Sequence, residues 1–311
     1  MENTNDNRFL KFIEEEGINQ ELIDGVKEYL AEYPEESGYA DRIPDPEYYF
    51  YGKEIWEEAL SAMLCGKNLL LAGPKATGKN VFCGNLAALF RRPAWNVSFH
   101  IGSDAASLIG TDTFDGQKVV FREGPITLAA KHGGFAILDE INMARNEALA
   151  VLHSTLDYRR SIDVPGYDQI KIAPAARFIG TMNYGYAGTR ELNEALCSRF
   201  AILEMPVISE ADLSRLLRRS FPDLTDAMLE QFTALFYELD RKAEKAEISD
   251  RALDLRGLLD AIDMMKRGTT SGDALDMCIT NKTFDPYERT LIRDVLKARI
   301  PQDLTKDVIF K

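Results

Sequence analysis

One segment of this 311-residue chain constrains the fold more than any other. It is a glycine-rich loop at 73–80 that lies between an apolar run at 68–72 and a helical pattern at about 79–90. The apolar run is short and lacks polar alternation, which is typical of a strand buried on both faces of a parallel sheet. A strand, a Gly-x-x-x-x-Gly-Lys loop and a helix in direct succession predict a phosphate-binding loop in an α/β protein.

Each residue type in this loop has a physical role. The two glycines let the backbone wrap around phosphate oxygens, the amides at the start of the helix point at the anion, and the lysine places a cation on the terminal phosphates. We therefore expect the whole loop to bind a nucleotide. Its residues are Gly73, Pro74, Lys75, Ala76, Thr77, Gly78, Lys79 and Asn80.

Asn80 departs from the usual pattern of such loops. The residue after the lysine is normally Ser or Thr, whose hydroxyl binds Mg²⁺. An amide carbonyl oxygen is also a hard ligand that suits Mg²⁺, so Asn80 is a candidate metal ligand whose geometry and affinity need not match those of a hydroxyl. This departure also leaves open a nucleotide-dependent switch that binds nucleotide and hydrolyses little of it.

Three further segments read as buried strands. They cover residues 95–99, 135–138 and 178–181, and each is a run of apolar or β-branched residues bounded by turn signals. With the run at 68–72 they predict a parallel sheet sandwiched by helices. Residues 113–121 contain an Asp-Gly pair between β-branched and aromatic residues, which predicts a β-hairpin.

Polar residues follow two of these strands. Asp139 and Glu140 come directly after 135–138, and the carboxyl edge of a parallel sheet is where ligands bind. Asp139 would hold Mg²⁺ through its water shell and Glu140 would activate the attacking water, whereas a solvated strand end is the plainer alternative. Asn183 ends the strand that starts at 178 and would contact the γ-phosphate or the attacking water, or would serve as a simple turn residue.

Arginines provide the remaining candidates. Residues 192–200 read as a helix that ends in Arg199, which could stabilise charge at a neighbouring subunit's nucleotide or could simply cap the helix. Arg190 is a weaker candidate for the same role. Arg251 and Arg256 lie near a helix start, where cations are disfavoured unless they serve an anion, so one of them would reach the γ-phosphate. We favour Arg256.

The length corresponds to about two domains. We expect a helical segment and linker at 1–47, an α/β nucleotide-binding domain at 48–207 and a smaller helical lid domain at 208–311. In the first segment, apolar spacing predicts a pair of helices between residues 9 and 30, broken near Gly17. Aromatic residues just before the first strand could line an adenine pocket, although packing in the core is the favoured interpretation. They are Tyr49, Tyr51 and Trp56.

Composition excludes some classes of function. The chain has 50 acidic and 37 basic residues, a net charge of −13, so its overall field does not attract nucleic acid. The four cysteines form no pair with metal-ligand spacing, which favours buried, reduced thiols. The chain begins with no signal-like segment and has no apolar run of membrane-spanning length. We expect a cytoplasmic protein without membrane insertion.

Taken together, the segments GPKATGKN, AILDEIN, GTMN and LNEALCSRF resemble the AAA+ ATPases of the MoxR type, over roughly residues 50 to 265. The hairpin at 113–121 is similar to the helix-2 insert of that dynein-related clade. The resemblance implies ATP and Mg²⁺ as cofactors and a homo-oligomeric ring, usually a hexamer. It also implies a chaperone-like action on a protein client, often one with a von Willebrand factor A domain. The residues that would take the motif roles are Lys79, Asp139, Glu140, Asn183, Arg199 and Arg256.

The restriction-associated AAA+ GTPases are an alternative resemblance. They are DNA-directed motors that share the acidic pair and the sensor asparagine. The acidic charge and the lack of any Lys/Arg-rich run argue against a nucleic-acid partner.

Overall fold

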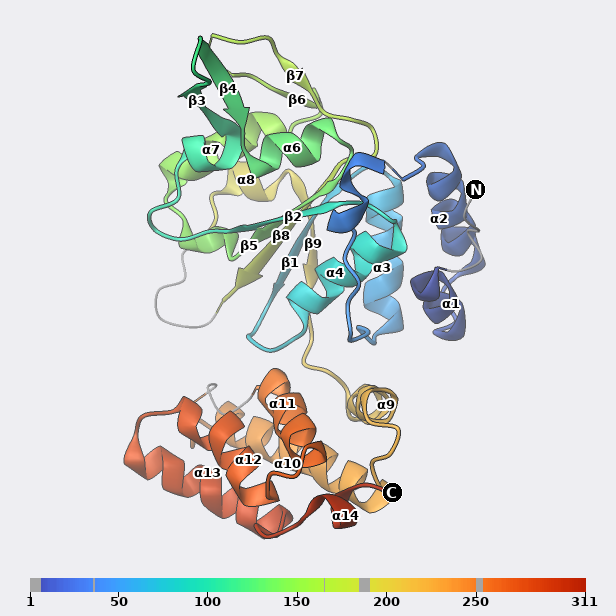
Figure 1. The fold of residues 1–311 in the computed structure, drawn as a ribbon, viewed down its shortest axis with the longest axis vertical. Helices are drawn as coiled ribbons and strands as arrows, with labels where there is room; N and C mark the ends of the chain where they lie inside the picture. The colour runs from blue at the N-terminus through green and yellow to red at the C-terminus, as the bar shows by residue number, and fades with distance from the viewer. Residues whose placement is uncertain (1–6, 36, 165, 185–190, 250–253) are drawn as a thin grey trace. The chain divides into compact units, whose positions relative to one another are not determined.

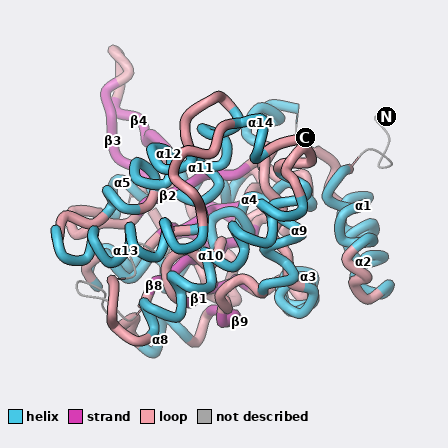
Figure 2. Tube along the Cα trace, turned by 90° about the horizontal axis from the view of Figure 1, so that it is seen from below, coloured by secondary structure: helices cyan, strands magenta, loops and turns pink. Residues whose placement is uncertain are grey.

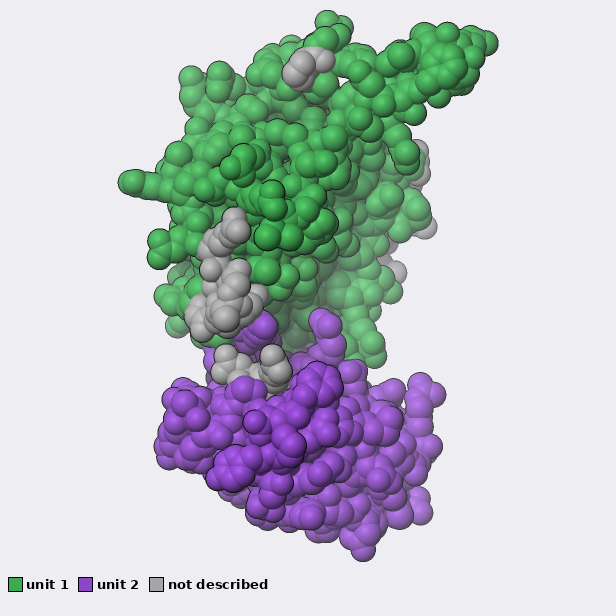
Figure 3. Space-filling view, turned by 90° about the vertical axis from the view of Figure 1, so that its left-hand side faces the viewer, with its two compact units in different colours: residues 1–74, 78–206 green, residues 75–77, 207–311 purple. Residues whose placement is uncertain are grey.

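The computed structural model describes residues 7–35, 37–164, 166–184, 191–249 and 254–311. The chain divides into two compact units, coloured green and purple in Figure 3. The first consists of residues 1–74 and 78–206, and the second of residues 75–77 and 207–311. The first is an α/β unit and the second is helical, and each is described by itself below.

A five-stranded parallel sheet forms the centre of the first unit (Figure 1), in the order β2-β5-β8-β1-β9. The fold class is therefore the predicted one, and the four predicted strands are present, with bounds that differ by a residue or two. The fifth strand, β9, was not predicted. The strands are β1 (Asn68–Gly73), β2 (Ala94–Ser98), β5 (Phe135–Asp139), β8 (Arg177–Asn183) and β9 (Phe200–Glu204).

Helices cover the two faces of this sheet. The helices α3 (Lys53–Leu64) and α4 (Lys79–Leu89) pack against β1, β5 and β8. On the other face α6 (Pro125–Lys131) and α7 (Asn146–Thr155) enclose a buried core with alternate strand residues. Side chains alternate between the faces of a strand, so most residues of the central strands β1, β5 and β8 meet an apolar layer on either face. In the edge strands, Asn96 and Ser98 of β2 and Ile202 and Glu204 of β9 are exposed. The strand members of the α6/α7 core include Leu70, Trp95, Val97, Ala136, Leu138 and Phe178.

The predicted hairpin is present. Strands β3 (Gly110–Phe114) and β4 (Val119–Glu123) pair in antiparallel fashion after the short helix α5 (Ala105–Ile109). At the turn, the Asp115 carboxylate accepts the amides of Gln117 and Lys118, and Gly116 takes the positive φ of +101°. The hairpin projects from the body of the first unit (Figures 1 and 2) and leaves Phe114 67% exposed.

A second, shorter hairpin lies beside the first. It consists of β6 (Ser161–Ile162) and β7 (Ile170–Lys171). Tyr167, between these strands, stacks on Phe121 of β4 with a centroid distance of 5.2 Å. Its hydroxyl donates a hydrogen bond of 2.7 Å to Asp112 of β3. The two hairpins are therefore joined by both an apolar and a polar contact.

The predicted helix pair at the start of the chain consists of α1 (Arg8–Glu15) and α2 (Gln20–Glu32), and Gly17 between them has a φ of +68°. Both helices pack on the first unit. The α2 residue Tyr29 donates a hydrogen bond of 2.6 Å to the Ala175 carbonyl.

Two of the three aromatic residues before β1, Tyr51 and Trp56, lie in the core, as favoured from the sequence, and Tyr49 is partly buried. Trp56 is fully buried and meets Phe82 edge-on at 4.8 Å, and Tyr51 is 7% exposed. Tyr49 instead stacks on Phe12 of α1 at 4.6 Å. These contacts account for the aromatic cluster without a ligand.

The second unit consists of helices. Its longer helices begin at a side chain that caps the first amides, which is a strong start signal in sequence. These caps are Ser209, Thr225, Asp254, Thr270 and Asp285. The helices are α9 (Glu210–Ser220), α10 (Asp226–Glu244), α11 (Leu255–Lys266), α12 (Ser271–Cys278), α13 (Pro286–Arg299) and α14 (Lys306–Ile309).

Two expectations drawn from composition can be compared with the structure. In the described part of the chain, no helix combines the length and the apolar character that crossing a bilayer requires. All four cysteines are free thiols, but only Cys83 is buried. Cys65 is exposed and Cys197 and Cys278 are partly exposed, so the expectation of buried thiols was wrong for these three. Cys65 lies at the C-cap of α3, where the chain turns on the surface toward β1.

Candidate active site at the carboxyl edge of the sheet

The parallel register brings the predicted site residues to one edge of the sheet. Gly73 at the end of β1 lies opposite Asn183 at the end of β8. In the same direction, Asp139 ends β5 opposite Ser98 of β2. The loop that follows β1 and the polar residues that follow β5 and β8 therefore meet at the carboxyl ends of adjacent strands, where α/β proteins bind ligands.

Two glycines of the loop lie where the backbone conformation or the space around the backbone favours glycine. Gly78, directly before α4, has a φ of +80°, which L side chains rarely adopt. At Gly73 a Cβ atom would lie 2.6 Å from the Met205 carbonyl oxygen, so only glycine fits between the loop and the end of β9. The loop can therefore follow a tight path that starts α4 with its amides directed at the ligand position.

Lys79 is the first residue of α4 and is buried. Its ammonium donates to the carbonyls of Gly73 at 3.0 Å and Pro74 at 2.5 Å, so it lies across the start of the loop. Burial lowers the pKa of Lys79 to about 8, partly offset by the nearby Asp139 and Glu140 carboxylates. Because phosphate oxygens would favour the charged ammonium, this lysine is electrostatically prepared for an anion.

Two side chains contact the Asp139 carboxyl group. The Thr181 hydroxyl donates a hydrogen bond of 2.6 Å to its Oδ1 atom, and the Asn80 amide lies 3.1 Å from its Oδ2 atom. The Thr181 hydroxyl also accepts the backbone amide of Glu140 at 3.0 Å. One buried threonine on β8 thus fixes both members of the acidic pair that follows β5.

Glu140 has an unusual backbone conformation. Its φ of 53° places it in the left-handed region, which is strained for a residue with a Cβ and costs about 1 to 3 kcal/mol. Its carboxylate accepts a hydrogen bond of 3.2 Å from the Asn183 side chain. The Asn142 amide in turn donates to the Asn183 carbonyl at 2.8 Å. Strain that is held by such a network is typical of functional positions.

The donor atoms at this edge suit Mg²⁺. A carboxylate, a hydroxyl and an amide oxygen are hard ligands, and Mg²⁺ usually takes one or two protein ligands and completes its shell with phosphates and water. Among the described residues, no group of three or more His, Cys, Asp or Glu side chains forms a metal site. Asp139 and Asn80 would therefore hold Mg²⁺ together with a nucleotide rather than in an all-protein cage.

Sequence reasoning did not identify Thr181 as a site residue. It is 1% exposed, and it binds both Asp139 and Glu140. The available signal was a hydroxyl two residues before Asn183 in a strand that otherwise consists mostly of apolar side chains. Because side chains on a strand point to alternate faces, residues 181 and 183 share a face, and a polar residue at both positions indicates common polar surroundings.

Arg199 lies at the opposite end of the sheet. The predicted helix at 192–200 was too long, because α8 spans only Glu194–Cys197 and Phe200 already pairs with Asn68 in the sheet. Asn193 caps the first turn of α8, and the residues after Arg199 form β9, which pairs with β1. Asn68 and Gly73 are five positions apart on β1, which corresponds to about 16 Å at about 3.3 Å per residue.

The favoured lid arginine, Arg256, lies within the described residues. Arg256 is exposed and is the second residue of α11, a position near a helix start as predicted. Arg256 belongs to the second unit, and its role at the γ-phosphate stays a prediction. Arg251, the alternative to Arg256, and Arg190, the alternative to Arg199, lie outside the described residues.

Comparison with known proteins agrees with this geometry. Residues 68–200 match the AAA domain of the dynein-related subfamily. The Bacillus subtilis protein YojN, itself uncharacterised, is 30% identical over 288 residues, which cover 91% of this chain and 93% of YojN. The uncharacterised protein SSP1341 of Staphylococcus saprophyticus is 32% identical and covers 68% of this chain, which spans 82% of SSP1341.

Among solved structures, a mutant of RuvB from Thermotoga maritima aligns over 80% of this chain and 71% of its own length. The TM-score is 0.48 and the sequence identity is 16%. The matched AAA domain contains the strands β1, β2, β5 and β8 and the glycine-rich loop after β1. The chain belongs to the same family as YojN, and it is an AAA+ protein in which residues 68–200 match the AAA domain of the dynein-related subfamily.

Proposed function

We propose that this protein hydrolyses ATP as a ring of identical subunits and uses the energy to remodel a protein client, as a chaperone of the MoxR type. The observation that carries the hydrolysis proposal is the linked set Asp139, Glu140, Thr181 and Asn183 beside the phosphate-binding loop. The strained backbone of Glu140 and the hydrogen bond that holds its carboxylate favour hydrolysis over nucleotide binding alone.

Each residue of this set has a proposed task. Lys79 and the loop amides would bind the β- and γ-phosphates, and bound Mg²⁺ would neutralise charge on them. Glu140 would accept the proton of the attacking water, and Asn183, which already donates to the Glu140 carboxylate, would orient the same water. Asp139 and Asn80 would hold Mg²⁺ from the protein side.

The position of Arg199 supports a ring. It lies about 16 Å from its own phosphate-binding loop along β1, and its guanidinium binds the carbonyls of His153 and Ala195 at that far end. An arginine so placed cannot serve the nucleotide of its own subunit. In a ring it would face the nucleotide of the next subunit, where it would stabilise charge in the transition state.

Two features support a protein rather than a nucleic acid as the client. The net charge of −13 disfavours binding to a polyanion, and the projecting β3–β4 hairpin exposes Phe114 and Val119 at its end. Whether the client contains a von Willebrand factor A domain is a part of the proposal that rests on the resemblance to MoxR proteins.

Mixing of inactive subunits tests the ring. Arg199→Ala should bind ATP and lose nearly all of its hydrolysis, because only the cation offered to the neighbour is lost. Lys79→Ala should lose its own nucleotide and still offer Arg199. Mixtures of the two should regain part of the turnover, in proportion to the mixed interfaces, and mixtures that stay inactive at every ratio would refute the inter-subunit role.

The class of client needs a separate test. Glu140→Gln in ATP and Mg²⁺ should hold the bound state and retain a co-expressed client, whereas Lys79→Ala should not. Turnover that rises with added double-stranded DNA, but with no protein, would overturn the chaperone proposal in favour of a DNA-directed motor.

A further inference from the structure

Asp157 lies two residues beyond the end of α7 and contacts Arg199. We propose that Asp157 is the positioning residue for Arg199, so that hydrolysis at one subunit depends on an acidic side chain of its neighbour. This inference rests on the proposed function of Arg199 as a cation that acts between subunits. Neither the motifs nor the resemblance in the sequence singles out Asp157.

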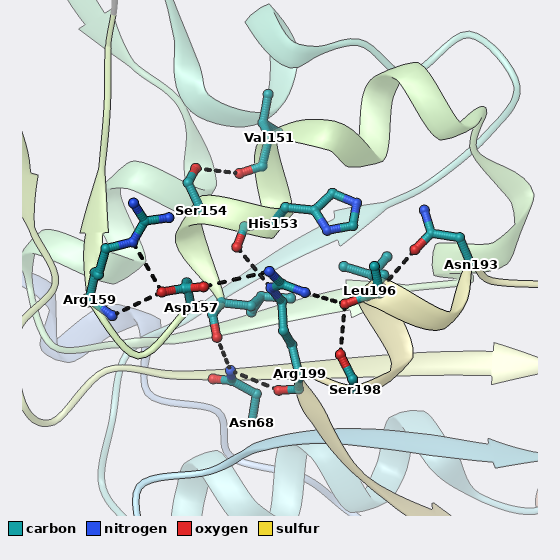
Figure 4. A network of polar contacts seen from close by, with 12 residues as sticks. Asn68, Val151, His153, Ser154, Asp157, Arg159, Asn193, Leu196, Ser198 and Arg199 are labelled. Carbon is teal, nitrogen blue, oxygen red and sulfur yellow. Dashed lines mark hydrogen bonds and ion pairs between the residues drawn. The ribbon is translucent and has the colours of Figure 1, made fainter.

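The Asp157 carboxylate divides its two oxygens between two arginines (Figure 4). Its Oδ1 atom accepts the Arg159 side chain at 3.1 Å and the Arg159 backbone amide at 3.3 Å. Its Oδ2 atom lies 3.5 Å from the terminal nitrogen of Arg199. The carboxylate therefore stands between two cations that would otherwise repel each other.

Arg199 is held on three sides. Its Nε atom donates to the His153 carbonyl at 3.0 Å, one terminal nitrogen donates to the Ala195 carbonyl, and the other faces Asp157. A guanidinium has five N–H groups, and these contacts engage three of them, so in the described structure two remain for an external anion. The Arg199 side chain is 27% exposed, which leaves an edge accessible to a neighbour.

The backbone segments that carry the two residues are also joined. The Asn68 side chain donates to the Leu156 carbonyl and to the Arg199 carbonyl, both at 3.3 Å. Asn68 is buried at the start of β1. This bridge fixes the end of α7 relative to the start of β9, so Asp157 and Arg199 have a defined separation before any side-chain contact forms.

The charge of Asp157 is maintained at neutral pH. Burial alone would raise its pKa, but the Arg159 backbone amide and guanidinium, with Arg199, hold the pKa below its usual value. An ionised carboxylate at this point restricts the rotation of a long side chain that would otherwise lose much conformational entropy on binding an anion. Because the Arg199 side chain is already restricted in the free subunit, it loses less conformational entropy when it binds the anion during the reaction.

The test uses the full chain and measures steady-state ATPase rates. Asp157→Asn should lower kcat about 10- to 100-fold, because a misplaced catalytic group costs about that much, and should leave KM for ATP near the parent value. Arg199→Ala should cost about 10³-fold. The matched control is Asp163→Asn, which removes a nearby exposed carboxylate that accepts a hydrogen bond from Gln169, and it should retain the parent rate.

Mixing gives the readout that a merely structural residue would not change. Asp157→Asn mixed with Lys79→Ala should regain turnover, because the intact Arg199 of the second subunit completes the site of the first. The conservative Asp157→Glu should restore most of kcat by itself. Intrinsic fluorescence of Trp56 and Trp95 checks that each variant retains the native fold.

The outcomes separate the two ideas. If Arg199→Ala is rescued by Lys79→Ala but Asp157→Asn is not, the role of Asp157 is wrong and the inter-subunit arginine stands. If neither variant is rescued, both the positioning role of Asp157 and the proposed inter-subunit role of Arg199 are refuted. If Asp157→Asn unfolds, or if its loss appears in KM rather than kcat, Asp157 supports the fold or its own nucleotide site, and the positioning role is refuted.

Discussion

Replacing Thr181 by valine isolates the contribution of one hydroxyl to the acidic pair. Valine has nearly the shape of threonine, so packing on β8 is preserved while two hydrogen bonds disappear. The bond to the Asp139 carboxylate is charge-assisted, and such bonds contribute about 1.5 to 3 kcal/mol, while an amide left without an acceptor costs about 1 to 3 kcal/mol. Water can reach the half-buried Asp139 and Glu140, so we expect a total loss of about 2 to 3 kcal/mol.

The assay can report the first unit alone, because both tryptophans of the chain, Trp56 and Trp95, lie in it. Urea unfolding followed by tryptophan fluorescence should show the midpoint shift for Thr181→Val. Thr181→Ser keeps the hydroxyl and should stay within about 1 kcal/mol of the parent. The kcat for ATP should also fall in Thr181→Val, since Glu140 loses its amide contact. A variant with parent stability and parent kcat would refute the role assigned to Thr181.

Three further predictions concern the nucleotide site. Affinity for a fluorescent ATP analogue should weaken as pH rises above about 8, by up to about tenfold per pH unit, because the Lys79 ammonium loses its proton and the phosphates favour the charged form. The variant Lys79→Ala should bind the analogue weakly and show no such dependence on pH. Affinity of the parent that stays constant between about pH 7 and about pH 9.5 would contradict the assignment. Glu140→Gln should bind ATP with parent affinity in the same assay and lose turnover in a phosphate-release assay, whereas hydrolysis at the parent rate would exclude Glu140 as the base. Asn80→Thr should lower the Mg²⁺ concentration needed for half-maximal ATPase activity modestly, and loss of activity would mean that the amide has a task that a hydroxyl cannot perform.

The strands could be predicted because their signal is local. In residues 68–72, 135–138 and 178–181 most side chains are apolar and buried whichever face they point to, and a strand buried between two helical layers favours that pattern. The glycine-rich loop could be assigned because its two glycines meet a local requirement, a positive φ at Gly78 and a close approach at Gly73.

What sequence reasoning missed depends on pairing between distant segments. Nothing local ends α8 at Cys197 instead of at Arg199; the pairing of Phe200 with Asn68 does so, and the two are 132 positions apart in the chain. The contact of Thr181 with Asp139 arises in the same way, from the parallel register of β5 and β8. The roles of Arg199 and Arg256 depend on neighbours outside the fold of the first unit and stay predictions.

Under the proposed function, the contact between the two hairpins would give the first unit a path for mechanical load. Tyr167 binds β3 through Asp112 and β4 through Phe121, so the exposed β3–β4 hairpin is joined to the β6–β7 hairpin and does not stand alone. Strand β6 begins at Ser161, four residues after Asp157. If the proposed client binds at that end, the force that it exerts would reach a segment only a few peptide bonds from the Asp157 carboxylate, which contacts Arg199.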